Sequence, residues 1–168
     1  SVPGIYAIGD VTGVSLLAHV ASMQGLVAAA NVTGGDARMD YSAIPNCIYT
    51  DPEIASVGLS EPTAKEQGRA VKVGRFNFAA LGKAMCIGEI AGLVKVVADA
   101  QTDRVLGVGI VGPHATDIIA EGVLAVRHGL TATQVAETIH SHPTLPEAVG
   151  EAMHDVHGQA IHKARLRA

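Results

Sequence analysis

The stretch GLVKVVADAQTDRVLGVGIV, residues 92–111, decides the fold class of this chain. It holds two valine-rich apolar runs, at 92–98 and 105–111, and the polar segment QTDR lies between them. Short apolar runs bounded by turn residues are typical of strands, and a connection this short joins antiparallel neighbours. The stretch therefore predicts a β-hairpin.

Other segments extend this hairpin into a sheet. Residues 46–50 and 54–59 are apolar runs on either side of DPE, and residues 71–78 alternate apolar and polar side chains, as a half-buried strand does. Gly107 and Gly109 lie inside a strand, and no helix opens on them. They therefore indicate close packing or a bulge rather than a nucleotide-binding loop.

Several segments have the periodicity or the capping residues of helices. Residues 16–32 and 115–128 are the longest, and the second is apolar nearly all round. Such a helix suits burial against the core on one side and against a partner on the other. Shorter helices are predicted after the N-cap Ser60, from the capping box of Thr131 to about residue 139, and from about residue 145.

Composition limits the classes of function. The chain of 168 residues has a net charge of −4 and scattered basic residues, which argues against a nucleic-acid partner. Apolar residues make up 48% of it but aromatic residues only 3%, so aliphatic side chains must fill the core and some apolar surface is expected to face a partner subunit. No apolar run reaches the roughly 18 residues of a membrane span, and we expect no signal peptide and a cytoplasmic protein.

Cysteine and histidine residues give little indication of a metal site. Cys47 and Cys86 form no CxxC or CxxxxC motif, so we expect structural thiols in a reducing compartment. His154 and His157 are three residues apart on one predicted helix, and His162 follows. Zinc sites usually need a closed set of four ligands, so we expect a solvated, partner-facing tail and no metal.

The stretch HSHPTLPE, residues 140–147, carries the candidate chemistry. Its two prolines stiffen the backbone, so that His142 is held just before a turn with Glu147 nearby. A carboxylate beside an imidazole selects one tautomer and stabilises the imidazolium, which is what a general acid/base needs. The spacing equally fits a capping box in which Thr144 is the N-cap and Glu147 only satisfies its backbone N–H. Both interpretations stay open on spacing alone.

The same stretch resembles the C-terminal active-site motif of dihydrolipoamide dehydrogenases, usually His-x-His-Pro-Thr-Leu-Ser-Glu, within the flavoprotein disulfide reductase family. The resemblance implies that His142 is the catalytic base, that Glu147 orients it, and that the His142–Pro143 bond is cis. Pro146 replaces the usual serine, in a first helical turn where proline is tolerated. His140 and Leu145 favour the dihydrolipoamide branch over glutathione reductase.

A second resemblance lies near the start of the chain. Residues 4–10 read as a short apolar strand that ends in Gly-Asp before a helix, and VPGIYAIGDV at 2–11 resembles the last FAD-binding segment of the same family. The resemblance implies that Asp10 accepts hydrogen bonds from the flavin ribityl chain. The resemblance also places four more residues beside the flavin: Leu16, Leu17, Ala18 and His19. Of these, His19 would at most line the site.

The resemblance implies an α+β fold: an antiparallel sheet with helices on one face, preceded by a strand–helix remnant of an FAD domain. We place that remnant at residues 1–35 and the interface (dimerisation) domain at 45–168. The polar, turn-rich segment 34–45 forms the boundary.

The resemblance covers only the last third of such an enzyme. No Gly-x-Gly-x-x-Gly, NAD fingerprint or CxxxxC is present, so we expect the chain alone to bind no cofactor and to be inactive. The full-length enzyme would be a homodimer that oxidises protein-bound dihydrolipoamide on the lipoyl domains of 2-oxo acid dehydrogenase complexes, with FAD and NAD. The alternatives are a stand-alone dimerisation or scaffold module and a fragment of a glutathione or mercuric type of reductase.

Overall fold

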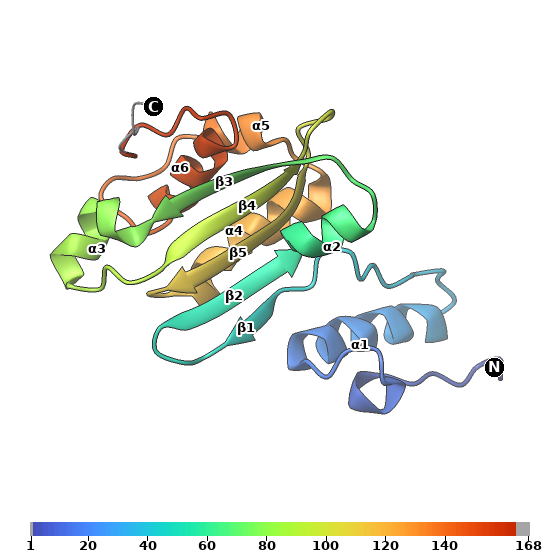
Figure 1. Cartoon of the computed structure of the whole chain (residues 1–168). Coiled ribbons are helices and arrows are strands. Elements are labelled where there is room, and N and C mark those ends of the chain that lie inside the picture. Colours follow the sequence, from blue (N-terminus) through green and yellow to red (C-terminus); the bar gives the residue numbers. More distant parts are fainter. Residues whose placement is uncertain (1, 164–168) are drawn as a thin grey trace. The chain divides into compact units, whose positions relative to one another are not determined.

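The structure is a computed structural model, and it describes residues 2–163. The chain divides into two compact units, Ser1–Tyr41 and Ser42–Ala168 (Figure 1). The division falls within the segment 34–45 in which the sequence places a boundary. That the first unit is a remnant of an FAD domain stays a prediction.

The second unit is built on a five-stranded antiparallel sheet with the strand order β1-β2-β5-β4-β3. The predicted hairpin forms strands β4 and β5, which pair in register with Val96 opposite Val108. The remaining predicted strands of this unit are also present, so the sheet is confirmed. The strands are β1 (Asn46–Ile48), β2 (Glu53–Gly58), β3 (Val71–Asn77), β4 (Leu93–Asp99) and β5 (Val105–Gly112).

Helices α4 (Ala115–His128) and α6 (Glu147–Asp155) cover one face of this sheet (Figure 1). Helix α4 packs on β2 and β5, and α6 packs on β3 and β4. The short α5 (Ala132–Ala136) packs against α6. Helix α2 (Glu61–Glu66) reaches the other face, because its Glu61 pairs with Lys95 and Arg75. The sequence did not predict η2 (Phe78–Ala80) and α3 (Gly82–Ile87), which fill the connection between β3 and β4.

The core between sheet and helices consists mainly of aliphatic side chains, as the composition predicts. Val94, Val96 and Ile110 of the sheet are fully or almost fully buried, and so is Met153 of α6. Glycine allows the closest approaches of backbone: a Cβ at Gly74 would lie 2.0 Å from the carbonyl oxygen of Ala152. Close packing of this kind fixes α6 against the sheet and leaves little freedom to the loop that precedes it.

Most helix ends follow the predicted caps. Helix α4 has the predicted bounds and ends at Gly129 with φ 62°, and Ser60 caps α2 by accepting the N–H of Thr63. Helix α5 has the predicted capping box but ends at Ala136, three residues early. Helix α6 begins at Glu147, two residues late, because the Thr144 hydroxyl donates to the carbonyl of Ser141 instead of accepting a helix N–H.

The first unit consists of the 3-10 turn η1 (Gly9–Thr12) and helix α1 (Ala18–Val32). The strand predicted at residues 4–10 is wrong: no strand is assigned there, and η1 begins at Gly9. An apolar run becomes a strand only where a neighbour pairs with it, and the described part of this unit has none. Buried Gln24 holds the unit together, because its side chain accepts the N–H of Gly9 and donates to the hydroxyl of Tyr41.

Within residues 2–163, no helix has the length and apolar character needed to cross a membrane.

Candidate active site

The loop between α5 and α6 presents His142, and its backbone has the shape that the sequence motif implies. The His142–Pro143 peptide bond is cis. Thr144 closes the loop on itself through a 2.7 Å hydrogen bond from its hydroxyl to the carbonyl of Ser141. The next helix begins three residues later, at Glu147.

His142 and Glu147 are in direct contact. The Nδ1 atom of His142 lies 2.8 Å from Oε1 of Glu147, and the imidazole is 75% exposed whereas the carboxylate is 18% exposed. The second oxygen, Oε2, accepts the backbone N–H of Thr144 at 2.7 Å. One carboxylate therefore contacts the imidazole and satisfies the N–H of Thr144. Thr144 is nevertheless not the N-cap of α6, which begins only at Glu147, so the capping-box interpretation is wrong.

The surroundings of Glu147 keep it ionised. Burial acts to raise the pKa of Glu147, but the N–H of Thr144, the hydrogen bond from His142 and the charges of His142 and His162 outweigh it, so the pKa lies below its ordinary value. A carboxylate can only accept hydrogen bonds, so Nδ1 of His142 carries a proton. In the neutral ring, Nε2 is then the free acceptor, and the exposed ring offers it to whatever approaches this surface.

His140 faces inward, unlike His142. Its Nε2 atom lies 2.9 Å from Oε1 of Glu121 on α4, and its Nδ1 atom lies 2.8 Å from the carbonyl oxygen of Thr138. The hydrogen bond with Glu121 raises the pKa of His140, and burial opposes it. Both ring nitrogens thus face acceptors, which is the arrangement that an imidazolium satisfies. His140 links α4 to the loop that carries His142, and Glu121 is a partner that sequence reasoning missed.

An apolar groove of about 450 Å³ adjoins His140, between α4, α5 and the loop. Leu124 of α4 and Ile139 of the loop line it, and they are 58% and 96% exposed. Large aliphatic side chains with this exposure, gathered beside a groove, mark a surface that another protein surface covers. That a partner covers the exposed side of α4 stays a prediction.

Residues 44–153 match the dimerisation domain of the pyridine nucleotide-disulphide oxidoreductases. The chain belongs to this dimerisation-domain family. The resemblance seen in residues 140–147 is thereby confirmed at the level of the family, and so is the sheet-and-helix fold.

Individual relatives agree with the family. A dihydrolipoyl dehydrogenase of Thermus scotoductus is 51% identical over 96% of this chain, and one of Bacillus subtilis is 52% identical over 94%. The crystal structure of LpdA from Mycobacterium tuberculosis superposes on 89% of the chain with a TM-score of 0.84 and 30% identity. This chain spans 35%, 34% and 33% of those three proteins, so it corresponds to about a third of such a protein.

The residues predicted to bind FAD all lie in the first unit, outside the segment that matches the dimerisation-domain family. Asp10 lies in η1, not at a strand end, and its side chain is exposed. Leu16 is 70% exposed, Leu17 is half-buried, and Ala18 and His19 open α1 on its exposed side. Binding of FAD stays a prediction.

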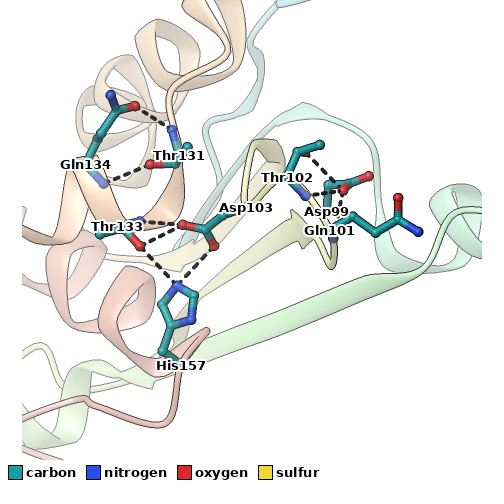
Figure 2. Close-up of polar contacts among 8 residues, drawn as sticks. All are labelled: Asp99, Gln101, Thr102, Asp103, Thr131, Thr133, Gln134 and His157. Carbon is teal, nitrogen blue, oxygen red and sulfur yellow. Dashed lines mark hydrogen bonds and ion pairs between the residues drawn. The ribbon is translucent and has the colours of Figure 1, made fainter.

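The C-terminal histidines do not form a freely solvated tail, and this corrects the sequence-based expectation for His157 and His162. Figure 2 shows Asp103 between Thr133 and His157. Nε2 of His157 lies 3.0 Å from Oδ1 of Asp103, and the N–H and hydroxyl of Thr133 donate to Oδ2 at 3.0 and 2.7 Å. Nδ1 of His162 lies 2.7 Å from Oε1 of Glu151. In the described part of the chain, no three His, Cys, Asp or Glu residues gather as a metal site.

The cysteines of this dimerisation domain have different surroundings. Cys47 in β1 is half-buried, and burial together with the charges of Glu53 and Asp117 raises the pKa of its thiol. A raised pKa disfavours the thiolate, which is the reactive form. Cys86 on α3 is exposed, so the structural role expected of it from the sequence has no support in packing.

Proposed function

We propose that this chain is the interface part of a dihydrolipoyl dehydrogenase and that His142 and Glu147 form the acid/base pair of that enzyme. The observation that carries the proposal is the 2.8 Å contact between Nδ1 of His142 and Glu147, on a ring that is 75% exposed. The names of the relatives at about 50% identity support the choice of activity.

The role of the pair follows from thiol chemistry. A dithiol must lose a proton before it can attack a disulfide, because the thiolate is the nucleophile, and a free thiol has a pKa of about 8.5. Nε2 of His142 accepts that proton, and the ionised Glu147 stabilises the imidazolium through Nδ1. FAD bound in the whole protein would supply the redox chemistry by which electrons pass from the reduced dithiol to NAD.

His142 contributes to an active site that also needs groups from outside its own loop. The ring is mostly exposed, so the substrate and the redox disulfide approach from a surface outside its own loop. We assign that surface to the partner subunit of a homodimer. The dimer face includes the groove of Leu124 and Ile139, because a twofold contact needs a self-complementary apolar patch.

Three further parts of the proposal concern the whole protein. Asp10 and residues 16–19 contribute to FAD binding, and lipoyl domains deliver the substrate. The two free cysteines fit a cytoplasmic location.

The proposal is tested by the substrate preference of the full-length protein that contains this chain. Purified with its flavin, it is expected to reduce NAD with dihydrolipoamide and to show no turnover of glutathione disulfide with a reduced nicotinamide. The reverse preference would favour a glutathione type of reductase and contradict the proposal.

A second candidate function, a stand-alone dimerisation module, is favoured by the independent core of the second unit. We expect the isolated chain to fold and to carry no flavin. Visible flavin absorbance that survives purification of the 168-residue chain would contradict this expectation for the isolated polypeptide.

A further inference from the structure

Strand β3 lies at one edge of the sheet, so one side of its backbone has no neighbouring strand in the described part of the chain. In an antiparallel pair, alternate residues direct both N–H and C=O toward the partner, and the others direct both away from it. The carbonyl of Ala70 accepts the N–H of Ala100, and the N–H of Phe78 donates to Gly92, so the even-numbered residues face β4. The outward backbone groups therefore belong to Val71, Val73, Arg75 and Asn77.

The side chains of β3 give this edge little protection of their own. An unpaired strand edge is a template for another strand, and proteins usually protect it with charged side chains, proline or a covering segment. Strand β3 has no proline and only two charged residues, Lys72 and Arg75. The charge of Arg75 is already paired, because its guanidinium lies 3.0 Å from Oε2 of Glu61. Protection of the edge must therefore come from another part of the chain.

The ion pair of Asp155 and Lys163, here called the edge clamp, occupies the edge at Arg75. Arg75 donates its backbone N–H to Oδ2 of Asp155 at 2.8 Å, and its carbonyl accepts a hydrogen bond from Nζ of Lys163 at 3.1 Å. The same ammonium group lies 2.6 Å from Oδ2 of Asp155. One acceptor and one donor therefore take the two places that a residue of a neighbouring strand would take.

The segment that carries Lys163 is fastened to α6 by a second set of contacts. Buried Glu151, which is 6% exposed, accepts the backbone N–H groups of Ile161 at 2.8 Å and of His162 at 3.2 Å. Its other oxygen lies 2.7 Å from Nδ1 of His162. These bonds replace the hydration that a buried carboxylate loses, and they fix the segment in place. Lys163 follows His162 directly, so it is held beside β3 (Figure 1).

We propose that residues 156–163 form a strap that closes the edge of β3 against strand addition by a second copy of this chain. With the edge clamp in place, Val71 and Val73 are the only two consecutive outward positions left to an incoming strand. Without it, β3 offers four outward positions over seven residues, an ordinary length for a paired strand. The partner is a second copy, because every copy carries the same edge and two such edges can pair across a twofold axis.

Sedimentation of the 168-residue chain at rising concentration tests the proposal. Lys163→Ala removes the donor of the edge clamp, so its average mass is expected to reach at least about twice that of wild type, since strand addition joins whole copies. Lys65→Ala is the matched control, because it removes the same charge and a 2.7 Å ion pair with Glu61 but no bond to the backbone of β3. It should sediment as wild type does. Equal masses of Lys163→Ala and wild type would overturn the proposal.

Second-site changes locate the extra association. Val73→Pro added to Lys163→Ala is expected to restore the wild-type mass, because proline has no N–H for an incoming strand and that of Val73 points away from β4. Val73→Lys should do the same by placing like charges where two copies meet. Ile139→Asp lies at the groove beside α4 and should leave the doubling by Lys163→Ala intact. Extra mass that both Val73 changes leave, or that Ile139→Asp removes, would contradict pairing at this edge.

Amide hydrogen exchange tests the edge clamp itself. In dilute Asp155→Ala, exchange at Arg75 is expected to accelerate at least about tenfold, because that N–H loses a charged acceptor. Slow exchange in β4 shows that the fold is kept. An unchanged rate at Arg75 would refute the clamp. None of these measurements involves a dithiol, a flavin or the pair of His142 and Glu147, so their failure can be told apart from failure of the proposed function.

Discussion

The ring of His140 lies directly against the backbone of Gly150: a Cβ on Gly150 would come within 2.9 Å of Cε1 of His140. Gly150 sits inside α6, where glycine normally weakens a helix by about 1 kcal/mol relative to alanine. The close approach explains why glycine fits here. It allows the first turns of α6, including Glu147, to lie next to the ring that joins the loop to α4.

Gly150→Ala is therefore expected to destabilise the protein by about 1–2 kcal/mol despite its better helix propensity, because the His140 ring must move away from Glu121. Urea unfolding measures the change. Gly82→Ala, at the start of α3 with open space around its Cβ, is the control and should be neutral or slightly stabilising. Equal changes in unfolding free energy in Gly150→Ala and Gly82→Ala would show that the contact between Gly150 and His140 is not tight.

The His140–Glu121 pair should make stability depend on pH. The folded pKa of His140 is raised above its unfolded value of about 6.5, so its contribution is fully present below that value and is lost as the pH rises through the folded pKa. Wild type should therefore exceed His140→Gln in unfolding free energy by more at about pH 5.5 than at about pH 8.5. Glu121→Gln should remove this difference. A difference in unfolding free energy between wild type and His140→Gln that grows with rising pH would contradict the raised pKa of His140.

Asp103 is expected to stabilise the junction of the β4–β5 turn, α5 and the end of α6. Asp103→Asn keeps a residue type that tolerates its φ of 62° but removes the charge that Thr133 and His157 contact, and should cost about 1–3 kcal/mol in thermal or urea unfolding. Asp117→Asn removes an exposed carboxylate that lies 3.5 Å from His114 and should change stability by less than about 0.5 kcal/mol. A similar loss in both variants would rule out a special role for Asp103.

The proposed dimer face predicts the effect of a charge in the groove. Ile139→Asp should shift the chain from dimer to monomer in sedimentation, because an unpaired carboxylate would be buried where the two copies meet. Met85→Asp on α3 is the control, since Met85 is also exposed, at 56%, but lies away from the groove. An Ile139→Asp variant that remains dimeric would place the interface elsewhere.

Local patterns predicted most of the sheet and the long helix α4. The β4–β5 hairpin and the capping box at Thr131 need only neighbours a few residues away, so the sequence contains their signal. The strand predicted at residues 4–10 failed because pairing depends on a distant partner, and an apolar run does not reveal whether one exists.

The candidate site shows the same contrast between contacts of sequence neighbours and contacts of residues far apart in the sequence. The contact of His142 with Glu147 joins residues five positions apart, and the motif pointed to it. Glu121 lies 19 residues from His140, and Glu151 lies 11 residues from His162, so neither pairing has a spacing that periodicity would single out. A glutamate within the otherwise apolar run AVGEAM, residues 148–153, was the signal that the sequence offered for Glu151.

The most direct test of the central claim is the rate at which dihydrolipoamide reduces the flavin of the full-length protein carrying His142→Gln. Loss of a general base typically lowers a rate by about 10²–10⁴, and we expect a decrease in that range with a normal flavin content. A variant that is reduced as fast as wild type would contradict the assignment of His142 and Glu147 as the proton-accepting pair.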